Sequence, residues 1–391
     1  MVKTVAMPVS LGLCPDLPSP EWQTTCVEGG ARHSDTHRPG GVSGIPCLIL
    51  TDGLFRSAEA KTAHGLLRCG DRFSPLALID GVSAGSTTAE VIADLRVDVP
   101  IFATVDEAVA EFPAISTTVV GISTPGGRLT ESLRRTLAEC ATHSLNLVSG
   151  LHDFLADDLV IAAEAAAHGV TITDVRRPPD RSQLHSWNGS IYDVRATRVA
   201  VLGMDCIVGK RTTAQALTQE INERGRHAEM IYTGQTGWMQ GSRYGIVLDA
   251  IVDDFITGEL EHAIVQCDRD LGPDFMIIEG QSGMQNPVSP TGPAILLSAD
   301  VDAVILHVMP ARRKYFGTDV AVKSLESEFT LTQAYGIPVV GVSLNALGAT
   351  SEDIADVVRF CRAHSLPLAD PVRDGAGPLA EAVLGINPRE R

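Results

Sequence analysis

The stretch Gly203-Met-Asp-Cys-Ile-Val-Gly-Lys-Arg-Thr-Thr213 decides the fold of this chain. It follows a short apolar run at 198–202 that is typical of a buried strand, and it precedes the periodic apolar positions of a helix over 214–224. A glycine-rich turn between a strand and a helix lets successive N–H groups point inward, and the positive end of the helix dipole adds to them. The stretch therefore predicts a phosphate-binding loop with Lys210 as its fixed positive charge.

The spacing of this loop departs from the standard G-x-x-x-x-G-K-[S/T] pattern. Gly203 and Gly209 are one residue further apart, and Arg211 stands where a magnesium-binding hydroxyl is expected. Thr212 and Thr213 follow at once and can supply that hydroxyl after a small change of register. The pattern leaves open whether the loop binds the phosphates of ATP or those of coenzyme A. We expect the cofactor to be held by Gly203, Asp205, Cys206, Gly209, Lys210, Arg211, Thr212 and Thr213.

Length and composition predict a globular protein of two domains. A chain of 391 residues exceeds one ordinary core, and 44% hydrophobic with 20% charged residues is not a disordered composition. The formal charge of −17 disfavours nucleic acid and anionic membranes as partners, so an anionic ligand needs a local basic pocket. Because no apolar run is long enough to cross a bilayer and no signal peptide is visible, we expect a cytoplasmic protein with reduced cysteines.

The pattern along the chain predicts the domain boundaries. Residues 1–44 are rich in Pro, Gly, Ser and Thr, which indicates an N-terminal extension. Apolar runs then alternate with amphipathic stretches, as in a parallel sheet covered by helices on both faces. We therefore expect an α/β protein with a Rossmann-like parallel-sheet domain over 45–176, a linker over 177–196 and a P-loop parallel-sheet domain over 197–391. For the first domain we expect strands at 47–50, 76–79, 118–122, 145–148 and 170–172, and helices at 58–68, 87–95, 129–142 and 158–168.

Ligands of such sheets collect beyond the carboxyl ends of the strands. In the first domain His152 and Asp153 lie in an expected loop of this kind and can act as acid and base. Arg56 and Arg128 lie in two others and can grip a carboxylate, although capping and turn roles remain the alternative. None of these loops has the G-x-G-x-x-G fingerprint, which disfavours a nicotinamide site.

An acidic residue follows a second buried run in the P-loop domain. Glu279 ends the apolar run 275–278, at the point where a strand emerges beside the phosphate loop. This is typical of a Walker-B-like acid that holds Mg²⁺ or orients a nucleophile. Asp249 and Asp253 stand four positions apart on an expected helix, so they predict either a water-mediated magnesium site or a solvated surface.

A run of positive charge follows the next expected strand. Arg312, Arg313 and Lys314 lie within the stretch Pro310-Ala-Arg-Arg-Lys-Tyr-Phe316. In an acidic protein they are a candidate clamp for substrate carboxylates or for a further phosphate. Chance surface charge is the alternative.

The phosphate loop resembles that of the dethiobiotin synthetase family. Its residues Gly203-x-Asp205-x-x-Val208-Gly209-Lys210 share the spacing of Gly-Thr-Asp-x-x-Val-Gly-Lys-Thr, and Glu279-Gly-Gln-Ser-Gly283 is similar to that family's acid-then-glycine segment. The resemblance implies that Lys210 contacts phosphates and that Glu279 binds magnesium. Thr212 is then the hydroxyl ligand of the metal, since Arg211 replaces the usual one.

A broader resemblance runs from about Ile45 to the end, to a bacterial family catalogued as a domain of unknown function. Its members pair a Rossmann-like N-terminal domain with a P-loop C-terminal domain, and one has an assigned activity as a D-glutamate N-acetyltransferase. The resemblance implies acetyl-CoA as acetyl donor and a small acidic amino acid as acceptor. The motifs that carry it include Asp52-Gly-Leu-Phe, Lys61-Thr-Ala-His-Gly-Leu-Leu-Arg68, Ser149-Gly-Leu-His-Asp-Phe-Leu155, Asp174-Val-Arg-Arg177, Thr233-Gly-Gln-Thr-Gly237 and Ile278-Glu-Gly-Gln281.

We therefore expect an N-acetyltransferase, working as a homo-oligomer by analogy with its fold class. Glu279 or Asp205 takes the proton from the substrate ammonium group, backbone N–H groups stabilise the oxyanion, and the cations at 312–314 hold the substrate carboxylates. The alternative is an ATP- and Mg²⁺-dependent kinase or ligase, in which Thr212 and Glu279 hold the metal. A nucleotide-gated binding protein without turnover is a third possibility.

Overall fold

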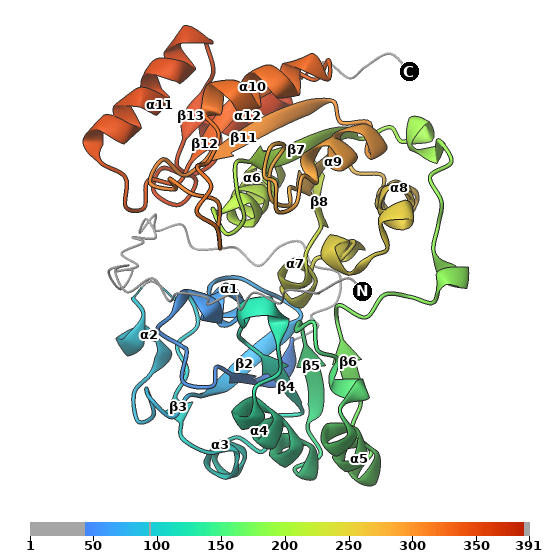
Figure 1. Ribbon diagram of the computed structural model, residues 1–391, viewed down its shortest axis with the longest axis vertical. Coiled ribbons are helices and arrows are strands. Elements are labelled where there is room, and N and C mark those ends of the chain that lie inside the picture. Colours follow the sequence, from blue (N-terminus) through green and yellow to red (C-terminus); the bar gives the residue numbers. More distant parts are fainter. Residues whose placement is uncertain (1–43, 94, 387–391) are drawn as a thin grey trace, which may run out of the picture.

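Two α/β domains make up the chain, and the computed structural model describes residues 44–93 and 95–386. Figure 1 shows the N-terminal domain, in blue to green, below the C-terminal domain, in yellow to red. The extension expected over residues 1–44 lies outside the described residues except for Gly44. Each domain is built on one parallel sheet, so the predicted α/β fold class is confirmed.

The N-terminal sheet has the order β3-β2-β1-β4-β5-β6, with all strands parallel. This is the strand order of the Rossmann fold, in which the winding reverses beside the first strand. The strands are β1 (Ile45–Leu50), β2 (Phe73–Ile79), β3 (Ile101–Phe102), β4 (Thr117–Val120), β5 (Asn146–Ser149) and β6 (Ile172–Asp174). The helices around them are α1 (Lys61–Arg68), α2 (Thr88–Val91), α3 (Val105–Glu111), α4 (Glu131–Thr142) and α5 (Leu159–His168).

Two elements of this domain, β3 and α3, were not predicted from the sequence. β3 has two residues, too few for a periodic signal. α3 begins at a capping box between Thr104 and Glu107, a local signal that the apolar pattern alone misses. The helix expected over 87–95 is the single turn α2, because Ile92 already has an extended backbone.

The C-terminal sheet places β7, the strand before the phosphate loop, in its middle. The order is β13-β12-β11-β7-β10-β8-β9, and all strands are parallel. Every residue of β7 is buried, as expected for a central strand covered on both faces. The strands are β7 (Thr197–Gly203), β8 (Ala228–Tyr232), β9 (Tyr244–Gly245), β10 (Phe275–Glu279), β11 (Ala303–Val308), β12 (Val339–Leu344) and β13 (Leu368–Ala369). The helices are α6 (Lys210–Glu223), α7 (Gln235–Met239), α8 (Asp253–Leu271), α9 (Gly292–Ser298), α10 (Leu325–Ala334), α11 (Ser351–Ala363) and α12 (Gly377–Leu384).

The segment between the sheets runs from the end of β6 to the start of β7 and packs on α8. The buried carboxylate of Glu261 accepts hydrogen bonds from the backbone N–H groups of Asn188 and Ile191, at 2.8 and 3.1 Å. The segment is therefore held to the C-terminal domain through its own backbone. Its short 3₁₀ turns are η4 (Arg181–Gln183) and η5 (Ser190–Asp193).

Asp249 and Asp253 do not share a helix, so the expected placement of both on one helical face is wrong. Asp249 lies in the 3₁₀ turn η6 (Leu248–Ala250), and Asp253 is the first residue of α8. The two elements are separated because Val252 has an extended backbone that starts α8 afresh. Among the described residues, no helix is both long and apolar enough to cross a membrane.

The two domains meet through α1 and α7. The side-chain amide of Gln240 donates to the carbonyl oxygens of Gly65 and Cys69, at 2.9 and 2.8 Å. Arg72 donates to the carbonyl oxygen of Trp238 at 2.6 Å, and its guanidinium lies 4.1 Å from the centre of that indole ring. These contacts bring the loops at the carboxyl ends of the two sheets toward each other.

Candidate active site

The phosphate loop joins β7 to α6, and its backbone needs glycine at two places. Gly209 has a φ of +121°, a conformation that residues with a Cβ rarely adopt. A Cβ on Gly203 would lie 3.0 Å from the carbonyl oxygen of His307 on the neighbouring strand. The strand, glycine loop and helix are thus arranged as in a phosphate-binding loop.

Lys210 is the first residue of α6 and is 6% exposed. Its Nζ donates to the carbonyl oxygen of Asp205 at 2.5 Å. Burial lowers the pKa of Lys210 to about 8, against the opposing charges of Cys206, Glu279 and Asp205. An anion bound in the loop would stabilise the charged ammonium group.

Thr213 lies beneath the loop rather than on it. Its buried hydroxyl is 3.0 Å from Nδ1 of His307 and 2.8 Å from the hydroxyl of Ser343. Nε2 of His307 lies 2.8 Å from the carbonyl oxygen of Val208, which only accepts, so this nitrogen carries the proton. Burial lowers the pKa of His307 to about 4 and keeps the ring neutral. The network fixes the loop from below. Of the two neighbouring threonines, Thr212 is therefore the exposed one.

Glu279 is the last residue of β10, which pairs with β7. It is 8% exposed, and its carboxylate accepts a hydrogen bond from the backbone N–H of Thr233 at 3.1 Å. Burial raises the pKa of Glu279, while Arg211, the Thr233 hydrogen bond and Lys210 act in the opposite direction. A carboxyl group with raised proton affinity next to two cations is suited to proton exchange.

Asp205 lies inside the phosphate loop and is fully buried. One carboxylate oxygen accepts from the side-chain amide of Asn286 at 2.9 Å, and the other accepts from the backbone N–H of Phe316 at 2.8 Å. Nε of Arg312 lies 3.5 Å from the second oxygen. Asp205 therefore ties the loops after β10 and β11 to the phosphate loop.

The structure separates the three cations expected to act as one clamp. Arg312 faces Asp205, whereas Arg313 forms an ion pair with Asp353 of α11 at 2.5 Å and Lys314 with Asp319 at 2.7 Å. The side chains of Arg313 and Lys314 are more than half exposed. Only Arg312 of the triplet is thus held against the phosphate loop.

The N-terminal domain contributes the loop after β5 to the domain junction. His152 in this loop packs on Gly127, where a Cβ would lie 2.3 Å from the imidazole Cδ2. Burial and the charge of Arg176 lower the pKa of His152. Arg128 is largely exposed and pairs with Asp153 at 3.4 Å, so it points to the surface.

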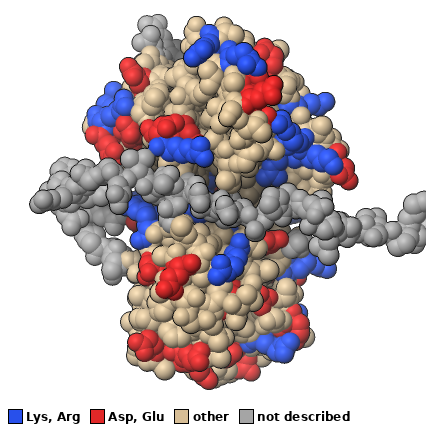
Figure 2. Space-filling view, turned by 90° about the vertical axis from the view of Figure 1, so that its left-hand side faces the viewer, with Lys and Arg blue, Asp and Glu red and all other residues tan. Residues whose placement is uncertain are grey.

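The sequence analysis missed two cations at this junction, Lys61 and Arg176. Arg176 is 7% exposed and donates to the side chains of Gln235 and Asp249, at 2.9 and 2.8 Å. Both cations lie in motifs that carry the family resemblance, and Lys61 also begins α1, where the helix dipole disfavours a positive charge. Figure 2 shows Lys and Arg side chains on both domains close to the line where they meet.

Comparison with known proteins identifies the family. Residues 185–380 match the family described as Domain of unknown function (DUF1611_C) P-loop domain, and residues 82–178 match Domain of unknown function (DUF1611_N) Rossmann-like domain. The chain belongs to the DUF1611 family. The predicted Rossmann-like N-terminal domain and P-loop C-terminal domain are therefore both confirmed.

Two curated relatives share the name D-glutamate N-acetyltransferase. The protein from Tritonibacter scottomollicae is 32% identical over 293 residues, which cover 72% of this chain and 85% of the relative. The protein from Pseudoalteromonas sp is 28% identical over 274 residues, covering 66% and 78%. A solved structure of a DUF1611 family protein from Anabaena variabilis ATCC 29413 has a TM-score of 0.79 and 27% identity, and covers 88% of this chain and all of that one.

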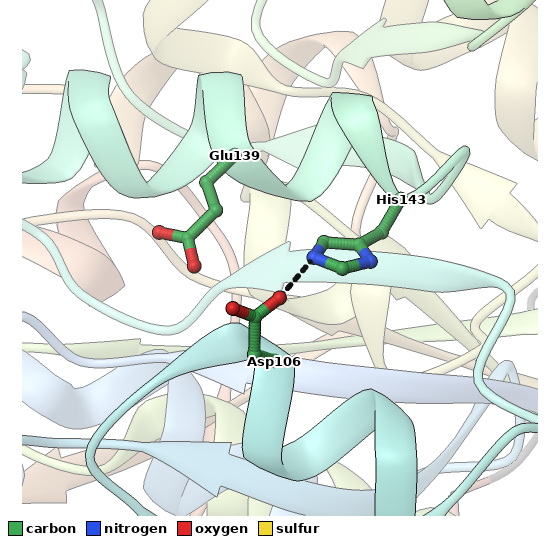
Figure 3. A group of neighbouring side chains, drawn as sticks. All are labelled: Asp106, Glu139 and His143. Atoms are coloured by element: carbon green, nitrogen blue, oxygen red, sulfur yellow. Dashed lines mark ion pairs between the residues drawn. The ribbon is translucent and has the colours of Figure 1, made fainter.

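A group of potential metal ligands lies away from the site of this DUF1611 protein. Within the described ranges, Asp106, Glu139 and His143 are the side chains whose ligand atoms gather within 4.8 Å. Figure 3 shows His143 of the α4 C-terminus pointing at Asp106 of α3, and the two form an ion pair of 2.8 Å. That pair accounts for their proximity, and Figure 1 places both helices on the far side of the N-terminal domain from the phosphate loop.

Proposed function

We propose that this protein transfers an acetyl group from acetyl-CoA to the amine of an acidic amino acid such as D-glutamate. The observation that carries the proposal is the buried carboxylate of Glu279 beside the phosphate loop, within the electrostatic reach of Lys210 and Arg211. The names of the two curated relatives, which align with most of the chain, support the same chemistry.

The phosphate loop fits the pyrophosphate of acetyl-CoA. Lys210 and the N-terminus of α6 supply positive charge, and the glycines allow close approach of the backbone. Nε of Arg211 is buried and has no hydrogen-bond partner among the described residues, so this side chain is available to a second anion beside the cofactor phosphates. The bound cofactor supplies the thioester, and Cys206 and Thr212 complete the loop that surrounds its phosphates, while the buried Thr213 supports that loop from below.

Glu279 acts as the general base in this proposal. The substrate arrives with an ammonium group, which must lose a proton before its nitrogen can bond to the acetyl carbon. A carboxylate with a raised pKa takes that proton, and the nitrogen bonds to the acetyl carbon as the thioester C–S bond breaks. The second proton that the nitrogen loses goes to the departing thiolate, so the coenzyme leaves as its thiol. Asp205 is the alternative general base, but its oxygens already accept hydrogen bonds from Asn286 and Phe316.

Substrate contacts are proposed on both sides of the junction. Arg312 approaches from the C-terminal domain, with Arg313 and Lys314 further out on the same loop. His152 lies on the N-terminal side of the junction, and Arg128 lies at the surface of the same domain. Because Arg313, Lys314 and Arg128 each have a carboxylate partner in the structure, a substrate would compete with that partner for them.

The test is an end-point assay of the purified protein with D- and L-glutamate, D-aspartate and D-glutamine. One arm contains acetyl-CoA and the other ATP with Mg²⁺, and products are identified by mass. An acetylated acidic amino acid formed without ATP supports the transferase. Release of ADP, with no reaction of acetyl-CoA, would replace the transferase with the ligase, in which the exposed Thr212 and the buried Glu279 hold the metal.

A further inference from the structure

Lys61 and Arg211 belong to different domains, yet both lie at the domain junction. Lys61 and Gly65 stand four residues apart in α1 and thus share one face of that helix. A Cβ on Gly65 would lie 3.2 Å from Nη2 of Arg211, which places this guanidinium of α6 against the same face. The charge of Arg211 also acts on the Lys61 ammonium group.

Arg176 brings a third positive charge to the same place. Its guanidinium is held by Gln235, by Asp249 and by the carbonyl oxygen of Gly150, so it has a fixed position. Its charge acts on Lys61 as well, and its Nε has no hydrogen-bond partner among the described residues. Lys61, Arg176 and Arg211 therefore form a cationic group that spans the junction.

Lys61 and Arg211 are both partly buried, and neither forms an ion pair with another described residue. Within the described part of the chain, no ion pair or side-chain hydrogen bond involves the Lys61 ammonium group, and Nε of Arg211 is buried without a partner. Burial lowers the pKa of both groups, which is the signature of desolvated cations. Desolvated cations without partners are costly, so an anion that binds here is strongly favoured.

The surroundings favour carboxylates over a further phosphate. Asp249 lies beside Arg176, and Glu279 acts on Arg211, so two carboxylates border the cationic group. They would repel a doubly charged phosphate more strongly than a singly charged carboxylate, and they would attract an ammonium group. An acidic amino acid presents both kinds of charge, with two carboxylates for the cations and one ammonium group for the acids.

We propose that Lys61 of the N-terminal domain and Arg211 of the P-loop domain, held beside Arg176, bind the carboxylates of the acidic substrate across the domain junction. This inference rests on the proposed function for the identity of the substrate. Binding of the carboxylates in this way orients the ammonium group toward Glu279. The substrate site is then complete only when both domains contribute.

The test compares the variants Lys61→Gln and Arg211→Gln with the wild type, using D-glutamate and its neutral amide D-glutamine as acceptors. Loss of one charge-assisted contact should raise the KM for D-glutamate at least about tenfold. The KM for acetyl-CoA should stay within about twofold. The preference for D-glutamate over D-glutamine should fall in the variant whose lost cation binds the side-chain carboxylate. Arg359→Gln, which removes an exposed charge of α11 paired with Asp356, is the matched control and should leave both KM values unchanged.

Two outcomes would overturn the inference. A raised KM for acetyl-CoA with D-glutamate unaffected would assign the cations to the cofactor. An equal loss with both acceptors in both variants would show that neither cation binds the side-chain carboxylate. Calorimetric titration of D-glutamate into each variant without cofactor separates this inference from the proposed function. If the wild type binds D-glutamate through Lys61 but acetylates nothing, the carboxylate site is supported and the transferase proposal is wrong. If the wild type acetylates D-glutamate and Lys61→Gln binds D-glutamate equally well, the transferase proposal is supported and the carboxylate site is wrong.

Discussion

Glu279 at the end of β10 accepts a hydrogen bond from the backbone N–H of Thr233, 3.1 Å away at the end of β8. The hydroxyl of Thr233 in turn donates to the carbonyl oxygen of Glu279 at 2.9 Å. This double contact between neighbouring strands fixes the carboxylate in one orientation at the carboxyl edge of the sheet. A carboxylate held in this way beside the phosphate loop is positioned to receive a proton.

Glu279→Gln should therefore lower turnover about 100-fold or more, because the amide cannot accept the substrate proton. The KM for acetyl-CoA should change little, since glutamine keeps the shape of the side chain. Steady-state kinetics with each substrate varied in turn measures both. Turnover close to that of the wild type would remove Glu279 from the chemistry.

The pH profile gives an independent check of the same group. Burial raises the pKa of Glu279, and the base works only when ionised. Wild-type kcat/KM should thus rise with pH through an apparent pKa above the ordinary value for glutamate, and this limb should vanish in Glu279→Gln. A limb that persists in the variant belongs to another group.

Asp205→Asn tests the competing assignment. Asparagine replaces one acceptor oxygen with an NH₂ group, so that a donor faces either Asn286 or the N–H of Phe316. We expect a loss of about 1–3 kcal/mol in the free energy of unfolding of the C-terminal domain. Denaturant melts give the stability, and turnover should fall less than in Glu279→Gln. Turnover abolished at unchanged stability would identify Asp205 as the base.

Glu328 of α10 should make stability depend on pH. It is 1% exposed, its Oε2 has no hydrogen-bond partner among the described residues, and burial raises its pKa to about 7 from an ordinary value of 4.5. The folded protein therefore holds this proton more tightly than the unfolded chain. The stabilisation is complete below pH 4.5 and is lost as the pH rises toward 7.

Glu328→Gln removes that dependence. The variant should gain stability relative to the wild type between pH 5 and pH 8, by up to ~3 kcal/mol. Glu381→Gln, at an exposed position of α12, is the control and should show no such change. The free energy of unfolding of the C-terminal domain is measured for variant and wild type at pH 5 and at pH 8. A difference between the two proteins that is the same at both pH values would contradict the account.

The phosphate loop was predictable from the sequence because its signals are local. A buried strand, two glycines, a lysine and a helix follow one another within Arg198 to Arg224, and the structure has them in that order. Glu279 was found for the same reason, as an acid directly after an apolar run. The Rossmann-like domain followed from alternating runs, apart from elements as short as β3.

What the sequence could not show depends on contacts between distant residues. Lys61 and Arg211 are 150 positions apart, and only the packing of α1 on α7 brings them together. Likewise, the sequence does not reveal that Arg313 has a partner in Asp353, 40 residues later. Asp249 was misplaced because the extended Val252 breaks a stretch whose composition suits one helix.

The central claim is that Lys210 and its loop hold the phosphates of the acetyl donor. It is tested most directly by comparing acetyl-CoA with S-acetylpantetheine, which carries the same thioester but lacks the nucleotide and its phosphates. Wild-type kcat/KM with D-glutamate should favour acetyl-CoA by at least about 30-fold, and Lys210→Met should remove most of that preference by lowering the rate with acetyl-CoA alone. An unchanged preference in Lys210→Met would show that the phosphates bind elsewhere and would contradict the account.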